Sequence, residues 1–458
     1  MDSSPFDIPE LQSLIGRYLD GKDIKTCALV CKTWHKTYQP LLWQRNRLLS
    51  SYGATHASAG FGDWQDSVRR NAHWIKDLDG PETDKAHEML LSIALERCRS
   101  LMSIKVAATT KDERDKWIQL IKFNPQLQKV AFWYWELQGG LDESLMVETL
   151  KGLDKLQHLE LRTASFPFIC RILESVPSLR ELVVGTVVTS EPGSEDQDGG
   201  AANKTTWPLR SLKITHDNSK LPLCDLLSRM PVLESLALEC VDEKSRQGLT
   251  QLIKEGRLPL LSEISLREEG DYTELVDALP PQHLRSAHLQ TFYSSTLKSL
   301  LKNQNQSLES LRLFGFDDYR ALADVFYECP RLKEFVVENE SAFEMLDVCH
   351  LLYKPWVCMD LERLSVPIGV DHGPVGDAIA PELSEAMAVN RTKRSRKSGW
   401  QLAENLFMNR FCKLKKLRDV NFVIDYKKRA LSLDHRIDAG CKTVENRRDS
   451  DEEESSDY

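Results

Sequence analysis

A leucine-based pattern repeats along most of the chain and constrains its fold more than any other feature. Each copy holds a Leu followed by apolar residues three and five positions later, and the clearest copies start at Leu156, Leu179, Leu233 and Leu308. Further copies start at Leu101, Leu127, Leu209, Leu261, Leu284, Leu332, Leu361 and Leu417. Successive starts recur with a period of roughly 25 residues. The last interval, from Leu361 to Leu417, is two periods or one period with an insertion.

Short helical segments separate the copies. Apolar residues have helical spacing in segments such as 168–176, 223–230, 249–255 and 321–329. Several of these segments end just before a proline, at Pro177, Pro231, Pro259 and Pro330. Proline ends a helix because it lacks the amide donor and clashes with the preceding turn. One strand and one helix in each such period is the pattern of leucine-rich repeats.

The region therefore resembles intracellular leucine-rich repeats. The resemblance implies an α/β solenoid in which stacked units share a core, because one strand and one helix cannot bury both faces alone. It also implies a horseshoe with parallel strands on its concave face. No ladder of Asn residues is evident, and Ala287 replaces a larger apolar residue in the copy that starts at Leu284.

Residues between and just after the apolar anchors are expected on the concave face, because side chains alternate along a strand. The candidate target-binding residues there are Trp133, Trp135, His158, Arg162, Arg267, His288, Arg312 and Phe314. Trp133, Trp135 and Phe314 are the candidate hot spots, since large exposed aromatic side chains supply much of the binding energy when a partner buries them. The alternative for each is packing on neighbouring side chains or covering an end of the solenoid.

The first 46 residues have a different, helical pattern. Residues 9–19 place apolar side chains on one helical face: Leu11, Leu14, Ile15, Tyr18 and Leu19. The run Asp20–Asp23 then breaks the helix, and Asp23 is placed to cap the next one. Short helices follow over 24–34 and near 40–43. So small a unit has more apolar surface than it can bury, which predicts a binding partner.

The order of short motifs in this segment resembles the F-box. Ile-Pro-Glu-Leu begins at Ile8, Tyr-Leu-Asp at Tyr18, Asp-Ile at Asp23, Leu-Val-Cys-Lys-x-Trp at Leu29 and Leu-Leu-Trp at Leu41. The resemblance covers residues 6–46 and implies binding to the Skp-family adaptor of an SCF-type cullin-RING ubiquitin ligase. The residues that match adaptor-binding positions are Ile8, Pro9, Leu11, Ile15, Leu19, Leu29, Val30 and Trp34. Ile8 stands where the motif has Leu, and periodicity alone also fits the core of an unrelated three-helix unit.

The remaining segments set the domain boundaries. Residues 47–99 are predicted as a helical connector with a flexible point at 50–62, and residues 100–426 as the solenoid. Insertions are expected near 190–206 and 371–400. The basic run 391–397 in the second insertion is either a nuclear import signal or a solvated loop. Residues 440–458 form an acidic tail that is expected to be disordered.

Composition places the chain among globular proteins, with 41% hydrophobic and 28% charged residues. The formal net charge of -9 argues against nucleic acid as a partner. A membrane partner is not expected either, because there is no run of about 18 apolar residues. The acidic N-terminus does not match a secretory signal, and the 11 cysteines form no Cys-x-x-Cys pairs, which favours reduced thiols. The expected location is the cytoplasm, the nucleus or both.

The sequence contains none of the common catalytic motifs. It has no His-Glu-x-x-His, no Gly-x-Ser-x-Gly and no Gly-rich dinucleotide turn, so neither a cofactor nor catalytic residues are predicted. Cys349, His350 and Cys358 come nearest to a set of metal ligands, but their apolar surroundings favour core packing.

The expected function is therefore that of a non-catalytic adaptor. Its F-box would bind a Skp-family adaptor, and cullin through it, while the repeats hold a target protein for ubiquitin transfer. Two alternatives remain: a scaffold with an F-box that acts outside a ligase, and an enzyme with an unrecognised site on the solenoid, for which the concave residues give no support. The repeat framework does not encode the identity of the target.

Overall fold

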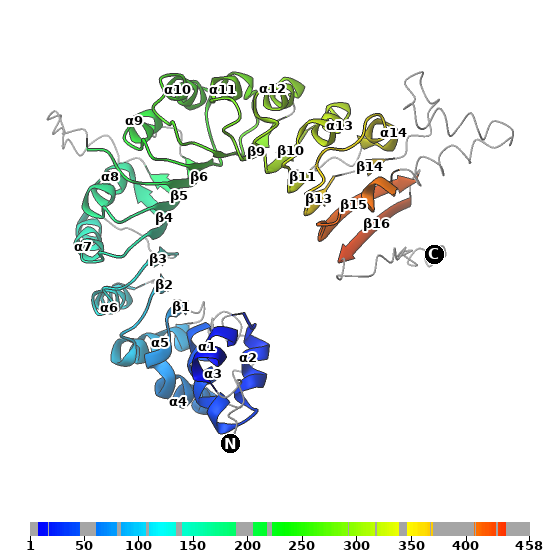
Figure 1. The fold of residues 1–458 in the computed structure, drawn as a ribbon. Coiled ribbons are helices and arrows are strands. Elements are labelled where there is room, and N and C mark those ends of the chain that lie inside the picture. Colours follow the sequence, from blue (N-terminus) through cyan, green and yellow to red (C-terminus); the bar gives the residue numbers. More distant parts are fainter. Residues whose placement is uncertain are drawn as a thin grey trace, which may run out of the picture. The chain divides into compact units, whose positions relative to one another are not determined.

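A computed structural model of the chain describes residues 8–45, 61–79, 84–106, 110–133, 140–188, 205–217, 222–338, 346–369 and 407–436, except residues 17, 292, 317, 367, 408, 427 and 428. The chain divides into two compact units, Met1–Pro222 (unit 1) and Leu223–Tyr458 (unit 2). Each contains largely parallel strands with helices on one side (Figure 1). Residues 50–60, nearly all of 190–206, the whole of 371–400 with its basic run, and the tail 440–458 lie outside the described residues.

Unit 1 begins with three short helices, α1 (Pro9–Gly16), α2 (Gly21–Ala28) and α3 (Lys32–Arg45). Their buried core consists of Ile24, Ala28 and Tyr38. Partly buried apolar side chains surround this core: Leu19, Cys27, Trp34, Leu41 and Leu42. The core of the small domain thus comes mainly from α2 and α3.

The break between α1 and α2 comes earlier than predicted, because α1 ends at Gly16 and α2 begins at Gly21, inside the run Asp20–Asp23 that was expected to separate the helices. The residue that caps α2 also differs from the predicted one. The carboxylate of Asp20 accepts a hydrogen bond from the amide of Asp23 at 2.7 Å. The prediction that Asp23 is the cap is therefore wrong, because the helix begins at Gly21 and Asp23 already lies in its first turn.

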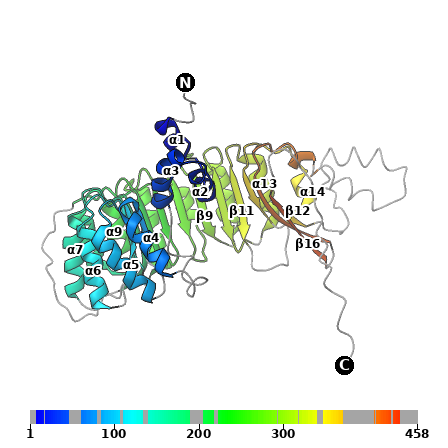
Figure 2. The same cartoon turned by 90° about the horizontal axis from the view of Figure 1, so that it is seen from below.

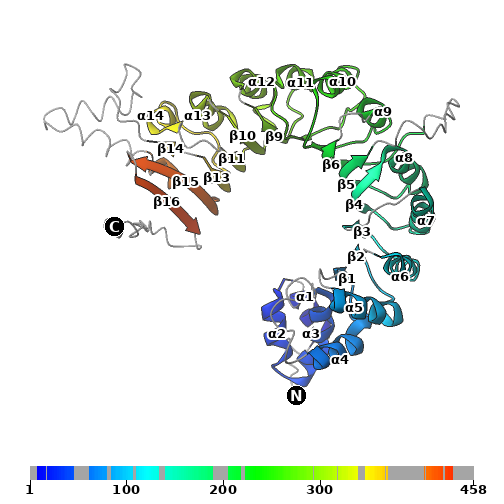
Figure 3. The same ribbon diagram turned by 180° about the vertical axis from the view of Figure 1, so that it is seen from behind.

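The rest of unit 1 alternates helices with strands. In chain order the elements are α4 (Phe61–Asn71), η2 (Ala72–Trp74), β1 (Asp77–Asp79), α5 (Asp84–Arg97), β2 (Ser103–Val106), α6 (Lys111–Lys122), β3 (Lys129–Phe132), α7 (Gly140–Lys151), β4 (His158–Ser165), α8 (Phe166–Ser175), β5 (Glu181–Val188) and β6 (Ser211–Asp217). Strands β1 to β6 pair in parallel in sequence order. Helices α6, α7 and α8 lie on one side of them (Figures 1 and 3). The sheet begins inside the segment predicted as a connector, because Leu78 of β1 pairs with Ile104 of β2.

Unit 2 has the same alternation. Its elements are α9 (Leu223–Ser228), β7 (Ser235–Leu238), α10 (Glu243–Lys254), β8 (Glu263–Leu266), α11 (Thr273–Ala278), β9 (Ser286–Gln290), α12 (Ser294–Gln304), β10 (Ser310–Phe314), α13 (Tyr319–Glu328), β11 (Glu334–Glu338), β12 (Leu346–Asp347), α14 (Val348–Leu351), β13 (Arg363–Ser365), β14 (Ile368–Gly369), β15 (Asp419–Tyr426) and β16 (Arg429–Arg436). Strands β7 to β11 pair in parallel, each with the next. Figure 2 shows the strands from β9 to β11 running side by side.

The C-terminal part of unit 2 departs from this simple order. Strand β13 pairs directly with β15, so the interval from Leu361 to Leu417 is one repeat that contains an insertion. Trp356, which precedes the insertion, contacts Phe407, which follows it, with ring centroids 5.8 Å apart. Strand β16 pairs antiparallel along the whole of β15. The last long parallel strand therefore has an antiparallel neighbour on one edge.

The repeat leucines anchor the strands of both units. All twelve lie two residues before a strand and are at most 5% exposed. Backbone hydrogen bonds fix the register beside them. The carbonyl of Met102 accepts from the amides of Gln128 at 2.8 Å and Lys129 at 3.0 Å, and the carbonyl of Glu309 accepts in the same way from Lys333 and Glu334. One carbonyl thus receives two amides of the next repeat, a pattern that recurs in each unit.

Two buried side-chain amides add to this backbone pairing. Asn124 accepts from the amide of Leu101 at 3.0 Å and donates to the carbonyls of Cys98 and Leu120. Gln304 accepts from the amides of His283 and Leu284 and donates to the carbonyl of Pro280. Each amide ties its own repeat to the preceding one, so the units use single amides in place of a continuous Asn ladder.

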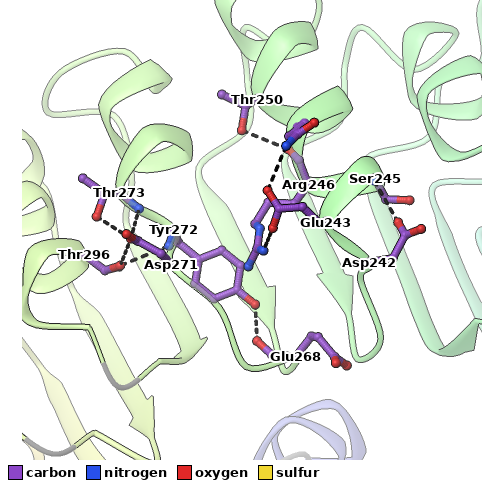
Figure 4. Close-up of polar contacts among 11 residues, drawn as sticks. Asp242, Glu243, Ser245, Arg246, Thr250, Glu268, Asp271, Tyr272, Thr273 and Thr296 are labelled. Carbon is purple, nitrogen blue, oxygen red and sulfur yellow. Dashed lines mark hydrogen bonds and ion pairs between the residues drawn. The ribbon is translucent and has the colours of Figure 1, made fainter.

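A polar network holds the loop between β8 and α11 against α10 (Figure 4). The Arg246 guanidinium pairs with Glu243 and lies 5.4 Å from the centre of the Tyr272 ring. Burial raises the pKa of Tyr272 to about 12, and its hydroxyl donates to the carbonyl of Glu268. A glycine fits at position 270, since a Cβ on Gly270 would overlap the guanidinium of Arg246. These contacts hold the loop that follows β8 in one conformation.

Candidate functional site: two interaction surfaces

The strand face of each unit consists of the side chains that alternate with the buried anchors of its strands. In β10, the predicted outward residues are partly exposed, while Leu311 and Leu313 between them are buried. Ala131 and Val336 also stand at positions between the anchors, which are expected to point outward, but both are buried. In register, Ala131 stands between Lys105 and Glu160. Val336 stands between Arg312 and Ser365. The strand face is therefore polar, with few apolar side chains accessible on it.

Trp133 is a large aromatic residue that the strand face of unit 1 leaves accessible, at 40% exposure. Nζ of Lys105 lies 3.8 Å from the centre of its ring and 3.5 Å from the Asp79 carboxylate. The backbone carbonyl of Trp133 accepts a hydrogen bond from Arg162 at 3.5 Å. Trp135, the neighbouring candidate, lies outside the described residues. The accessible surface of Trp133 is thus bordered by two cations.

Strands β4 and β5 lose the strict alternation of buried and accessible side chains just after their second anchors. Arg162 is exposed and Thr163 partly exposed, which interrupts the strict alternation of β4. The two strands approach closely at this point, because a Cβ on Gly185 would overlap the carbonyl oxygen of Arg162. His158, at the other end of β4, pairs with the Glu181 carboxylate at 2.7 Å. Arg162 and His158 therefore lie on the same face but at different points along its strands.

Glu334 organises the strand face of unit 2. Its carboxylate accepts from Arg312 at 2.7 Å, from Arg363 at 3.0 Å and from the Ser310 hydroxyl at 2.8 Å. Burial would raise the pKa of the Glu334 carboxyl, but the hydrogen bonds from Arg312 and Ser310 outweigh burial and hold the pKa below its usual range. One carboxylate therefore serves two guanidinium groups.

His288, Arg267 and Phe314 complete this part of the face. The His288 Nε2 atom lies 3.4 Å from the Ser286 hydroxyl and 3.4 Å from the Ser310 hydroxyl. Burial lowers the pKa of His288, and the neighbouring arginines lower it further against the opposing effect of Glu334. The Arg267 guanidinium lies 5.4 Å from the centre of the Phe314 ring and 3.7 Å from the Glu239 carboxylate. Phe314 is half-buried beneath this cation.

The second surface is formed by the N-terminal helices. Seven apolar side chains of α1, α2 and their flanks are between 39% and 84% exposed: Ile8, Leu11, Leu14, Ile15, Tyr18, Leu29 and Val30. The five on or beside α1 recur every three or four residues and so share one side of the helix. Monomeric proteins rarely leave so many large apolar side chains exposed on so small a domain. This surface fits burial by a partner.

The predicted adaptor-binding residues separate into two groups. Ile8, Leu11, Ile15, Leu29 and Val30 are exposed. Leu19 and Trp34 instead pack against the core of the small domain; the Trp34 ring lies 5.5 Å from that of Tyr38. The side chain of Pro9 lies outside the described part of the chain. Leu14 and Tyr18 are exposed beside the first group, although neither was among the predicted adaptor-binding residues. Their helical spacing with Leu11 and Ile15 was the signal that could have included them.

Some kinds of site are not seen among the described residues. No group of three or more His, Cys, Asp or Glu side chains is arranged to hold a metal ion in the described parts of both units. No helix in the described ranges is long and apolar enough to cross a membrane. The described cysteines are free thiols, including the buried Cys98, Cys329 and Cys358.

Comparison with known proteins identifies the N-terminal helices. The F-box-like family model matches residues 9–48, the segment that contains α1, α2 and α3. Among solved structures, the chain is similar to the leucine-rich repeat-containing protein LegL7 from Legionella pneumophila, with 14% identity over 62% of this chain and 89% of the other and a TM-score of 0.35. No curated protein matches the sequence at a significant level. The repeat assignment rests on the anchors and the parallel strands themselves. The chain therefore contains an F-box-like domain at residues 9–48, followed by parallel strands and helices with the leucine-rich-repeat pattern.

Proposed function

We propose that this chain is the substrate-recognition subunit of an SCF-type cullin-RING ubiquitin ligase. Its F-box-like domain binds a Skp-family adaptor and is linked to cullin through that adaptor. Its repeats hold a target protein. The chain itself is not an enzyme, and the other ligase subunits transfer ubiquitin. This role is carried out in the cytoplasm, the nucleus or both.

The exposed apolar surface of α1 and α2 carries this proposal. The surface belongs to the domain that the F-box-like model matches, and it includes Leu29 at 78% and Tyr18 at 84% exposure. Burying such side chains is favourable by about 25 cal/mol for each Å² removed from water. An adaptor with a complementary apolar groove is the kind of partner that would bury them.

The adaptor interface is tested with Leu29→Asp in the full chain. A carboxylate at a buried, apolar interface position costs about 3 kcal/mol or more, so we expect adaptor binding to weaken by roughly 100-fold. The measurement is co-purification with a Skp-family adaptor, followed by titration of the two purified proteins. Leu260→Asp is the matched control, because Leu260 is also an exposed Leu, at 44%, but lies in unit 2. Undiminished binding by Leu29→Asp would remove the basis of the proposal.

The ligase role is tested separately through target abundance. Removing the chain from cells should raise the amount of a protein that binds the repeats, and restoring the wild-type chain should lower it again. The Leu29→Asp chain should bind that protein but fail to lower its amount. A partner whose amount stays constant in all three conditions would indicate a scaffold that acts outside a ligase.

A further inference from the structure

The middle of the unit 2 strand face combines cations with one accessible aromatic ring. We define the cationic centre as Arg267, His288, Arg312 and Phe314. His288 lies on β9, Arg312 and Phe314 lie on β10, and Arg267 directly follows β8. Ser265, His288 and Arg312 are opposite one another in register, and Gln290 is opposite Phe314. The side chains therefore converge on one area of the sheet.

Three arginine side chains, Arg267, Arg312 and Arg363, gather at this place. Glu334 is shared between Arg312 and Arg363, so one negative charge faces two positive ones. Arg267 lies only within long ion-pair distance of Glu239, at 3.7 Å, and its side chain is 48% exposed. The two arginines oppose protonation of His288 more than Glu334 favours it, which agrees with a locally positive potential.

Acidic side chains border the cationic centre on both sides. Glu263 of β8 and Glu338 of β11 are exposed on the same face. Glu263 stands opposite Ser286, and Glu338 stands opposite Phe314. A long acidic segment laid across the strands would be repelled by these carboxylates. A single acidic side chain in the middle would avoid them.

We propose that the cationic centre binds one carboxylate side chain, an Asp or a Glu, from a target segment whose neighbouring residues are not acidic. The carboxylate lies between the Arg267 and Arg312 guanidinium groups, beside His288, and an adjacent apolar side chain of the target contacts Phe314. This inference rests on the proposed function, because it takes the strand face as the target-binding surface.

A carboxylate fits this place better than a phosphate group does. A phosphorylated side chain carries about two negative charges at neutral pH. Glu334, Glu263 and Glu338 would repel two charges more strongly than one. A carboxylate has one charge and accepts two hydrogen bonds from a guanidinium in the same plane. A monoanion therefore fits this place between the arginines and the bordering carboxylates.

The probe is a set of nine-residue peptide pools that differ at the central position. That position is Asp, Ser, phosphoserine or Lys, the flanking positions are mixtures of uncharged residues, and a fifth pool has three consecutive Asp residues at its centre. Each pool is captured on the immobilised full chain and quantified by mass spectrometry. We expect the single-Asp pool to be retained about tenfold better than the Ser pool and better than the other three.

Two variants assign the preference to the cationic centre. Arg267→Gln and Arg312→Gln should each reduce the advantage of the Asp pool over the Ser pool to about twofold or less. Arg267→Gln is the safer variant, because its half-exposed side chain is not held by Glu334. Arg257→Gln is the matched control, since Arg257 is exposed in the turn before β8 and away from the strand face. Circular dichroism establishes that each variant is folded.

Equal retention of the Asp and Ser pools, or an Asp preference that both variants keep, would overturn the proposal. Stronger retention of the phosphoserine or triple-Asp pool would overturn the assignment to a single carboxylate. No adaptor is present in this measurement. Failure of adaptor binding would therefore overturn the proposed function without changing the peptide preference. Loss of the peptide preference would overturn the carboxylate site without affecting adaptor binding.

A pH series adds a readout specific to His288. A bound carboxylate raises the pKa of His288 above its value in the free chain, so the complex takes up protons and the affinity rises as pH falls from about 8 to about 6. The charged groups facing His288 are Arg312 on β10, Glu334 on β11 and Arg267 after β8. His288→Gln keeps a polar side chain beside the hydroxyls of Ser286 and Ser310 but should make the affinity independent of pH in this range. A pH dependence that survives in His288→Gln would count against a carboxylate beside His288.

Discussion

The side-chain amide of Asn124 is completely buried and joins three backbone groups of two adjacent repeats. Asn124→Ala would leave the amide of Leu101 and the carbonyl of Cys98 without this partner. An unpaired buried polar group costs about 1–3 kcal/mol. We expect the free energy of unfolding to fall by about 2–4 kcal/mol, measured by urea titration followed by circular dichroism.

Gln126→Ala is the control for this change. Gln126 lies in the same turn and donates to the carbonyl of Arg99 at 2.9 Å, but it is partly accessible to water. Water replaces such a hydrogen bond, so the expected loss is below about 1 kcal/mol. Equal losses in both variants would mean that burial of the Asn124 amide does not determine the loss of stability.

The buried thiols give a prediction about pH. Burial raises the pKa of Cys98, Cys329 and Cys358 to about 12. A thiol whose pKa is raised on folding contributes fully to stability at pH values below its pKa in the unfolded chain, about 8.5. That contribution is lost as the pH rises towards the pKa in the folded chain, about 12. We expect the urea midpoint to fall between about pH 8 and pH 11. The size of the fall should shrink in Cys98→Ala, and an unchanged midpoint in the wild type would contradict the prediction.

The same burial predicts which cysteines react in the folded chain. At about pH 8, a thiol reagent should modify the exposed Cys31 and Cys240 quickly and leave Cys98, Cys329 and Cys358 intact until the chain is unfolded in urea. Mass spectrometry of digested samples gives the rate at each position. Modification of Cys98 as fast as Cys31 without denaturant would show that its surroundings open.

Some residues could be placed from the sequence and others could not. The twelve anchor leucines were predictable because burial of a regular apolar pattern depends on local spacing. Asn124 and Gln304 were not, because their partners are backbone groups of the preceding repeat, far away in the sequence. Trp34 was assigned to the adaptor surface by motif alone. Helical spacing cannot tell that surface from the core, where Trp34 lies against Tyr38.

At the scale of elements, β16 matters because it covers an edge of the last long parallel strand. An uncovered strand edge presents unpaired amides and carbonyls that other chains can join. A chain that ends after residue 426 lacks β16 and should form oligomers at micromolar concentrations, detected by light scattering on size-exclusion chromatography. A chain that ends after residue 436 keeps β16 and is the control. If both truncated chains stay monomeric, β16 is not needed to protect the edge.

Predictions of elements succeeded inside the repeats and failed at their ends. The strands follow each anchor at a constant distance, whereas the first strand, β1, lies in a segment without the full leucine pattern. It joins the sheet through β2, and this depends on pairing that no local pattern encodes. The cap of α2 was misplaced for a related reason. Both Asp20 and Asp23 are good caps, and which one serves depends on where the helix begins.

At the scale of the whole molecule, the division into two units predicts which strands a single substitution destabilises. Repeats are stabilised mainly by their nearest neighbours. Asn124→Ala should therefore speed amide hydrogen exchange in β1 to β4 far more than in β8 to β11. Gln304→Ala should do the opposite. Exchange that rises equally in both units for either variant would show that the chain unfolds as one cooperative body.

The class of the fold was predictable from the sequence, but the chemistry of its strand faces was not. The leucine pattern indicated stacked strands and helices, and the motifs near the N-terminus indicated the F-box-like domain. The cationic centre depends on the register of β8, β9 and β10, which brings together side chains from three repeats. No single repeat contains enough of these residues to mark the site.

The constant distance from anchor to strand has a consequence for how such a chain can evolve. The spacing between repeat starts varies along the chain, and a segment is inserted between Leu361 and Leu417, yet a strand begins two residues after each anchor leucine. Differences in repeat length therefore occur in the helices and loops that connect the strands. The strand side chains keep a spacing of about 4.8 Å from one repeat to the next. Point substitutions on the strands can therefore change the chemistry of a strand face, while insertions and deletions accumulate in the helices and loops without altering the spacing of that face.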